Sequence, residues 1–315
     1  MKVLYKLGCV MLLTAVLMGA FPTSRALAAP SPDGICFGPD QPLMILVVGT
    51  DSRSRSYTWG NGDSTMVFRV DFQEQQVDVM SFPRDLWVEI PDLEEVPDRT
   101  HGKLSMAYHF GTSGMGYYSG EGYGAGMVGE TLKVNYGLEI DHYIVINMRI
   151  FVEVIDALGG IKVYSPYPIY NHNRGPNSKP AFAQGGYFFG GREAQLYARY
   201  RDPRNVLSRP DRHSILLKSV CEQIFSPEVV FRIPELMSAF KGNVLTDMSL
   251  AELSQLLCLS SQVGMDGVRY HTIPEEELYH PDWVGSVWLE KESGMIRELL
   301  GEFENGTLPP NETEG

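Results

Sequence analysis

Apolar residues recur along the chain in the patterns that strands and helices require. Residues 43–48 form a continuous apolar run ending at Gly49, which is typical of a strand buried on both faces of a mainly parallel sheet. Apolar and polar side chains alternate over residues 66–72 and 77–81 around a polar turn, which predicts two strands joined by that turn. Further strands are predicted over residues 142–147, 161–164 and 268–273.

Between these strands the apolar positions take the spacing of helices. An amphipathic helix stopped by two glycines is predicted from the i, i+3, i+4 and i+7 spacing of Phe151, Val154, Ile155 and Leu158. Other helices are predicted over residues 193–200, 212–225 and 249–262. Strands that alternate with helices predict an α/β fold, with helices covering both faces of a central, mixed and mainly parallel sheet.

A glycine-rich segment interrupts both patterns. Residues 111–129 contain eight glycines, interleaved with tyrosines, and show neither helical nor strand periodicity. We expect a mobile surface loop there.

The first residues have the features of an export signal. Lys2 and Lys6 precede an apolar run over residues 7–21, and small residues up to Ala28 follow it. This predicts a signal peptide over residues 1–28, cleaved after Ala28. The alternative is an uncleaved anchor, although the run of 15 residues is short of the roughly 20 that span a bilayer as a helix.

The rest of the chain shows one composition regime. Four prolines and two glycines lie in residues 29–42, which predicts a linker. We expect a single domain over residues 43–303 and a polar tail over residues 304–315. The full chain has 39 acidic and 26 basic residues and a net charge of −13, which excludes the charge pattern of a nucleic-acid binder.

Cysteine usage is sparse and gives no metal-binding pattern. Once residues 1–28 are removed, the remaining cysteines are Cys36, Cys221 and Cys258, without the spacing of a metal site or a C-x-x-C motif. We expect these cysteines to be buried or joined in one pair.

Two aspartates stand at predicted strand termini. Asp51 follows the first strand, and Asp63 comes 12 residues later, just before the next strand. Ligands of open α/β sheets bind at the carboxyl ends of strands, so the two carboxylates could share one divalent cation. If that cation also contacts a phosphate, we expect Mg²⁺, with Mn²⁺ as the alternative. The competing interpretation is that both aspartates are turn formers.

Arginines provide a candidate anion site inside this acidic protein. Arg84 follows Pro83 at the end of a predicted strand, where it could bind a phosphate or form a surface ion pair with Asp85. A second group falls within 14 residues: Arg199, Arg201, Arg204, Arg209 and Arg212. A cluster of cations needs an anion if it lines a cleft, whereas a solvated charged face is the alternative.

Eight motifs in the expected order resemble the LytR-CpsA-Psr family of cell-envelope phosphotransferases. They are densest over residues 43–225 and lie at 45–53, 63–66, 81–85, 102–108, 140–143, 156–160, 191–201 and 209–212. The resemblance implies a three-layer α/β/α sandwich with an apolar tunnel for a polyprenyl chain, which we expect near the helix containing Phe151, Ile155 and Leu158.

The resemblance also implies an activity and a set of site residues. The family transfers a phosphoglycosyl polymer, such as teichoic acid or capsule, from a polyprenyl-pyrophosphate carrier to a peptidoglycan hydroxyl. The implied location is the outer face of the cytoplasmic membrane or the cell wall, or outside the cell if the signal is cleaved. Asp51 and Asp63 would hold Mg²⁺. The pyrophosphate would be bound by Arg84, Arg199, Arg201, Arg209, Arg212 and His213, with catalysis assigned to Asp63, Arg84, Arg199 and Arg201.

Two departures from the family pattern keep alternative functions open. The usual Arg-Gln pair is Arg212-His213 here, and the usual aspartate three residues before Arg209 is Val206. The alternatives are a polyprenyl-pyrophosphate pyrophosphatase, with water as acceptor, and a non-catalytic protein that binds lipid-linked glycan. We expect the aspartates and arginines to converge on one cleft, and Arg84 to matter more for turnover than for folding.

Overall fold

The structure is a computed structural model that describes most of the chain after residue 37. The described residues are 38–52, 57–91, 93, 100–170, 179–200, 208–224, 232, 244–263, 267–280 and 287–309. The predicted signal peptide, most of the predicted linker, and Val206 therefore lie outside the described residues.

The chain forms two units that are interleaved along the sequence. The first, here called the sheet unit, comprises Phe37–Met148, Val244–Ser249 and Met265–Gly315. The second, here called the hairpin unit, includes Arg149–Asn243 and Leu250–Gly264. The chain passes back and forth between the units, so neither unit is a contiguous segment. The single domain expected over residues 43–303 stays a prediction. Each unit is described by itself.

A six-stranded sheet with the order β10-β3-β2-β1-β6-β9 is the centre of the sheet unit. β1 runs parallel to β6 and β3 parallel to β10, whereas β2 is antiparallel to β1 and β3, and β9 to β6. Four strands therefore run in one direction and two oppose them, which confirms a mixed, mainly parallel sheet. The strands are β1 (Leu43–Thr50), β2 (Gly62–Asp71), β3 (Gln76–Phe82), β6 (His142–Asn147), β9 (Leu245–Thr246) and β10 (Val268–Thr272).

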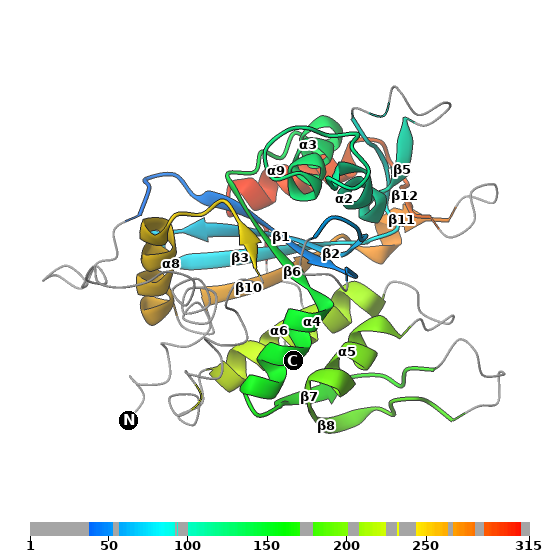
Figure 1. The fold of residues 1–315 in the computed structure, drawn as a ribbon, viewed down its shortest axis with the longest axis vertical. Coiled ribbons are helices and arrows are strands. Elements are labelled where there is room, and N and C mark those ends of the chain that lie inside the picture. Colours follow the sequence, from blue (N-terminus) through cyan, green and yellow to red (C-terminus); the bar gives the residue numbers. More distant parts are fainter. Residues whose placement is uncertain are drawn as a thin grey trace, which may run out of the picture. The chain divides into compact units, whose positions relative to one another are not determined.

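Three helices gather on one side of this sheet, as Figure 1 shows: α2 (Leu104–Gly111), α3 (Gly124–Tyr136) and α9 (Met295–Glu304). α2 contacts β2, α3 contacts β1 and β6, and α9 packs on α3. Short strands complete the unit: β4 (Trp87–Glu89) with β5 (His101–Lys103), and β11 (Leu278–Tyr279) with β12 (Leu289–Glu290), the latter pair preceded by the 3-10 helix η4 (Glu275–Glu277). The α/β class is confirmed. The second helical layer and the apolar tunnel stay predictions.

The prediction of a mobile loop over residues 111–129 is wrong at both ends, because α2 ends at Gly111 and α3 begins at Gly124. Glycine serves close packing between α2 and α3 here. A Cβ on Gly111 would lie 2.5 Å from the Met127 Cβ, and one on Gly124 would lie 2.7 Å from the Tyr108 carbonyl oxygen. The glycines that removed the helical periodicity are therefore the residues that let two helices approach each other.

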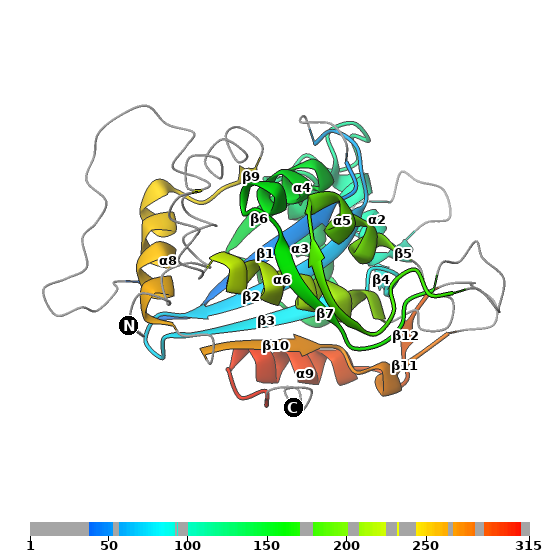
Figure 2. The ribbon, with the colours of Figure 1, turned by 90° about the horizontal axis from the view of Figure 1, so that it is seen from below.

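The hairpin unit is built around two antiparallel strands, β7 (Ile161–Ser165) and β8 (Gly185–Phe189). Figure 2 shows β7 beside α4, α5 and α6, and contacts join α6 to β7 and α5 to α6. The helices are α4 (Met148–Ala157), α5 (Gly191–Arg199), α6 (Ser208–Ile224) and α8 (Leu250–Gln262). In α8, Cys258 is disulfide-bonded, which agrees with the expectation that two of the cysteines form a pair. No helix within the described parts of the chain is long and apolar enough to cross a bilayer.

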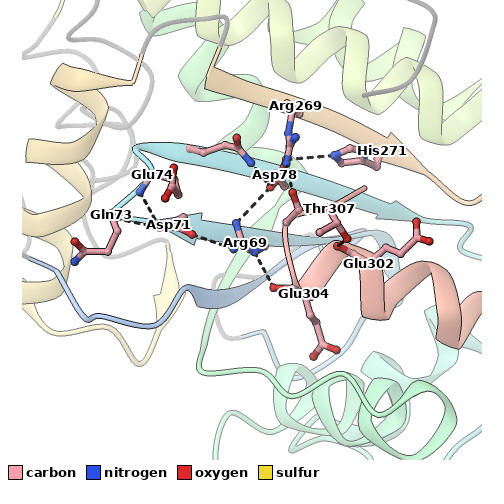
Figure 3. A network of polar contacts seen from close by, with 12 residues as sticks. Arg69, Asp71, Gln73, Glu74, Asp78, Arg269, His271, Glu302, Glu304 and Thr307 are labelled. Carbon is pink, nitrogen blue, oxygen red and sulfur yellow. Dashed lines mark hydrogen bonds and ion pairs between the residues drawn. The ribbon is translucent and has the colours of Figure 1, made fainter. Parts of the chain in front are cut away.

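A network of charged side chains holds β2, β3, β10 and the segment after α9 together (Figure 3). Arg69 pairs with Asp71 at 2.9 Å, and its Nε donates to the Glu304 carbonyl oxygen at 2.9 Å. Arg269 binds both carboxylate oxygens of Asp78, at 2.5 and 2.9 Å, and donates to the Gly306 carbonyl oxygen. The beginning of the predicted polar tail is therefore part of the folded unit.

Asp78 is the centre of this network. Burial alone would raise the pKa of Asp78, but hydrogen bonds from His271, Arg269 and Gln76 outweigh it and lower the pKa from 3.8 to about 2. The side chain is 1% exposed, so its charge depends on these partners. Because the folded-state pKa lies below the ordinary value, this stabilisation is complete above about pH 4 and is lost as the pH falls toward 2.

We therefore predict that Asp78→Asn lowers the free energy of unfolding by about 2 kcal/mol at neutral pH. The deficit relative to the original protein should begin to shrink below about pH 4, where Asp78 of the unfolded chain becomes protonated, and should vanish toward pH 2, where the folded-state carboxylate also becomes neutral. Urea unfolding between pH 3 and 7 measures it, with the exposed Glu222→Gln as the control. A deficit that stays constant over this range would contradict the prediction.

Candidate functional site

Strand direction brings three predicted site residues to the same edge of the sheet. β1 and β3 run in the same direction, so the residues that follow them, Asp51 and Arg84, leave at their carboxyl ends. β2 runs the opposite way, so Asp63, its second residue, begins at that same edge. The edge is where open α/β sheets bind ligands.

The carboxylate of Asp51 closes the connection between β1 and β2. Its Oδ1 accepts the Asn61 backbone N–H at 2.7 Å, its Oδ2 lies 3.4 Å from the Asn61 side-chain nitrogen, and the Asp51 N–H donates to the Asn61 carbonyl oxygen at 3.1 Å. A bulge between Gly49 and Thr50 shifts the register at this point. Asp51 therefore has the turn-forming role foreseen as an alternative, and this role fixes the position of its carboxylate.

Asp63 and Arg84 form an ion pair, with 2.9 Å between Asp63 Oδ1 and Arg84 Nη1. Their side chains are 8% and 17% exposed. Asp85 lies on the other side of the guanidinium, 3.5 Å from its Nε, and also contacts the Lys103 ammonium at 3.1 Å. Four charges of alternating sign, on Asp63, Arg84, Asp85 and Lys103, thus run from the start of β2 to the start of α2.

This arrangement changes the expectation for Arg84. The sequence suggested Asp85 as its nearest partner, whereas the structure places the buried Asp63 closer. Removing the cation would take its ion pair away from a buried carboxylate, which destabilises the folded state. Arg84 therefore contributes to folding as well as to the charge of the site.

The start of α2 holds the backbone around Arg84. The Ser105 N–H donates to the Arg84 carbonyl oxygen at 3.0 Å, and the Leu104 N–H donates to the Leu86 carbonyl oxygen at 2.8 Å. Sequence reasoning gave no role to Lys103 and Ser105. Their motif at residues 102–108 was the available signal, but its contacts depend on strand pairing.

The oxygen atoms at this edge suit Mg²⁺. Among the described residues, no group of three or more His, Cys, Asp and Glu side chains is placed to hold a metal, and the two predicted ligands, Asp51 and Asp63, both lie at this edge of the sheet. The Thr65 hydroxyl, also on β2, is buried and has no hydrogen-bond partner in the described part of the chain. Mg²⁺ is usually bound through one or two carboxylates together with substrate phosphates, so two carboxylates and a hydroxyl fit it.

The predicted arginine cluster belongs to the hairpin unit, where its described members differ. Arg199 is the last residue of α5 and is exposed. Arg212 is 0% exposed, and its guanidinium donates to the carbonyl oxygens of Tyr197, at 3.1 Å, and Tyr200, at 2.5 Å. His213 is half-buried. Arg201 and Arg204 lie outside the described residues, and so does the side chain of Arg209.

The contacts of Arg212 satisfy carbonyl groups at the end of α5, which otherwise lack helical partners. We predict that Arg212→Met lowers the free energy of unfolding by about 2 to 4 kcal/mol, because two buried carbonyl groups lose a donor. Thermal and urea unfolding measure this. The matched control is Arg199→Met, which removes an exposed guanidinium and should change stability by less than about 0.5 kcal/mol. Equal effects of the two substitutions would contradict the structural role of Arg212.

Comparison with known proteins gives the family. The sequence profile of the LytR_cpsA_psr family matches residues 27–298. The chain belongs to this family. A curated relative, the polyisoprenyl-teichoic acid--peptidoglycan teichoic acid transferase TagU of Halalkalibacterium halodurans, is 29% identical over 75% of this chain and 76% of its own length. The protein of the same name from Enterococcus faecalis is 27% identical over 76% of this chain and 77% of its own length.

Solved structures of this LytR-CpsA-Psr family share the fold. The crystal structure of TagV from B. subtilis covers 86% of this chain and 98% of its own, with a TM-score of 0.63 and 21% identity. The LytR-Csp2A-Psr enzyme from Actinomyces oris covers 90% of this chain and 96% of its own, with a TM-score of 0.59 and 18% identity. At these identities the comparison speaks for the fold alone.

Proposed function

We propose that this protein transfers a phosphoglycosyl polymer from a polyprenyl-pyrophosphate carrier to a hydroxyl group of peptidoglycan. Membership of the LytR-CpsA-Psr family supports the proposal, as do relatives named for the transfer of teichoic acid to peptidoglycan. The observation that carries it is the guanidinium of Arg84, which is held between two carboxylates at the ligand-binding edge of the sheet.

The reaction exchanges a phosphoanhydride bond for a phosphodiester bond. The acceptor hydroxyl oxygen attacks the phosphorus next to the sugar, and the bond from that phosphorus to the bridging oxygen breaks. Polyprenyl monophosphate leaves, the hydroxyl proton passes to a base or to water, and the polymer becomes joined to peptidoglycan through a phosphodiester. Negative charge builds up on the bridging oxygen, so fixed cations nearby accelerate the step.

Arg84 is suited to this task because its position is set before substrate arrives. An arginine side chain has five N–H donors, and Asp63 and Asp85 contact Nη1 and Nε. The Ser105 N–H fixes the Arg84 backbone, and Lys103 neutralises Asp85. A preorganised donor of this kind needs little rearrangement in the transition state. The pyrophosphate contacts expected of Arg199, Arg201, Arg209, Arg212 and His213 stay predictions, and the Arg212 guanidinium is already bound to two carbonyl oxygens.

Asp51 and Asp63 are the residues that would hold Mg²⁺, or Mn²⁺ in its place. When bound, the cation supplies positive charge that neutralises the pyrophosphate. Asp51 is fixed by Asn61, and Asp63 is fixed by Arg84, so both carboxylates are oriented by their own partners.

An exported location is part of the proposal. The disulfide of Cys258 suits an oxidising compartment outside the cytoplasm. The acceptor that the relatives' names specify is peptidoglycan, which also lies outside the cytoplasm. The proposed partners are lipid-linked glycan, peptidoglycan and the membrane surface.

Arg84→Lys tests the proposed role of the guanidinium. Lysine keeps a positive charge beside Asp63, so Arg84→Lys should retain most of the stability that this ion pair provides. Polymer transfer from a synthetic polyprenyl-pyrophosphate donor should fall by about 10²-fold, because the planar fork of donors is lost. The control is Arg297→Lys, an exposed arginine of α9. Undiminished transfer by Arg84→Lys would remove Arg84 from the reaction.

Asp51→Asn tests the metal site separately. An asparagine side chain keeps an oxygen that can accept the Asn61 N–H, but it loses the negative charge that binds Mg²⁺. We predict that Mg²⁺ tightens inorganic pyrophosphate binding to the original protein by at least about tenfold, and that Asp51→Asn abolishes this effect. Calorimetric titration with Mg²⁺ or EDTA measures it, with the exposed Glu139→Gln as control. Equal tightening in Asp51→Asn would exclude Asp51 as a ligand.

A further inference from the structure

Trp59 lies in the connection between the two aspartates and keeps a large apolar surface in water. It is 53% exposed, although tryptophan is among the residues whose burial stabilises proteins most. It stands two residues before Asn61, which is bonded to Asp51, and four residues before Asp63. Its position therefore depends on the same strand ends as the candidate site.

The backbone on both sides of Trp59 is held in place. The Thr58 carbonyl oxygen accepts the Gly114 N–H at 3.1 Å, and the Gly60 carbonyl oxygen lies 3.3 Å from His109 Nδ1. Gly60 has a φ of +147°, and a Cβ there would lie 2.5 Å from Thr50 Oγ1 at the end of β1. Only glycine fits this close approach without strain, so the segment is attached tightly to the sheet edge.

The indole ring itself is supported from behind. A Cβ on Gly114 would lie 2.5 Å from Trp59 Cε2 and 2.8 Å from Cζ2, so the ring packs directly on glycine backbone. The His109 ring lies 6.2 Å away at 47°, and a row of rings continues from it through Phe110 to Tyr117 at 5.9 Å steps. A ring that is packed on one side and 53% exposed in total is a fixed aromatic surface open to solvent.

We propose that Trp59 is a stacking surface for a sugar ring of the glycan substrate, a proposal that rests on the proposed function. The C–H face of a pyranose ring is apolar and weakly electropositive, which complements the negative face of an aromatic ring, while its hydroxyl groups stay in water. The glycan is attached to the phosphate that the neighbouring site binds, so a sugar ring must lie close to this edge.

The sugar can come from the donor or from the peptidoglycan acceptor, since both carry pyranose rings. The polyprenyl chain is a different kind of ligand. It is apolar throughout and has no hydroxyl groups that could stay in water while it lies on an exposed ring. Binding measurements with separate soluble probes distinguish these ligands and also separate the sugar surface from the phosphate site.

Calorimetric titration of the full chain tests the proposal with two probes, N-acetylated chitotetraose and Mg²⁺-pyrophosphate. Trp59→Ala should weaken chitotetraose binding by about five- to tenfold, the effect of one lost ring contact, and leave the Kd for pyrophosphate unchanged. Trp59→Tyr should restore most of the sugar affinity. The matched control is Tyr164→Ala, which removes another exposed aromatic side chain, 60% exposed, from the hairpin unit.

Two further titrations identify the source of the sugar. If Trp59→Ala weakens the binding of a soluble peptidoglycan glycan strand, the Trp59 surface serves the acceptor. If Trp59→Ala weakens the binding of a water-soluble, short-chain prenyl-pyrophosphate disaccharide, the Trp59 surface serves the donor. An equal chitotetraose Kd for Trp59→Ala and the original protein, or no saturable binding to the original protein, overturns the proposal. Weaker binding of farnesyl pyrophosphate, a probe without a sugar, to Trp59→Ala than to the original protein overturns the proposal as well. If the original protein does not bind Mg²⁺-pyrophosphate, that result counts against the proposed function instead.

Discussion

A carboxylate buried at the start of β2 needs a cation, and this requirement organises one edge of the sheet. Asp63 is 7% exposed and finds its partner in Arg84, at the end of the neighbouring strand β3. Arg84 in turn is flanked by Asp85, and Asp85 by Lys103 at the start of α2. The loops after β3 and before α2 are thereby tied to the strand ends, so the charges proposed to act on a pyrophosphate are in position without it.

β2 carries a paired aspartate at each end, and the two pairs serve different purposes. At the far end Asp71 and Asp78 are bound by Arg69 and Arg269, whose remaining donors bind the carbonyl oxygens of Glu304, the last residue of α9, and of Gly306. That network joins the last residues of the unit to the sheet, and it lowers the pKa of Asp78 to about 2. At the near end the pair faces the connections that follow β1 and β3, where ligands bind in folds of this kind.

The sequence predicted the elements whose periodicity is local. The apolar run of β1, the alternation through β2 and β3, and the spacing of α4 depend on each residue's own neighbours, and all three are confirmed. The start of α3 was missed because glycines placed for close contact with α2 remove the apolar pattern. Arg84 contacts Asp85 as expected, but its nearer partner Asp63 was missed, since the register of β2 with β3 cannot be derived from either strand alone.

Charge clusters were harder to interpret than strands. Arg199 and Arg212 look alike in the sequence, yet one is exposed at a helix end and the other is fully buried against carbonyl oxygens. Which arginine meets solvent depends on how α5 packs on α6, a contact between segments of the folded chain. Trp59 gave no signal at all, because its exposure follows from the backbone of Gly114 behind it.

The fate of oxygen in the reaction tests the central claim most directly. The original protein is incubated in ¹⁸O-labelled water with a polyprenyl-pyrophosphate-linked glycan and peptidoglycan, and the products are analysed by mass spectrometry. Transfer to a hydroxyl predicts polyprenyl monophosphate released in step with glycan phosphodiester on peptidoglycan, with no ¹⁸O in the glycan phosphate. Incorporation of ¹⁸O into the glycan phosphate would show that water is the acceptor, and no release of polyprenyl monophosphate would show that the protein binds its ligand without turnover; either result contradicts the account.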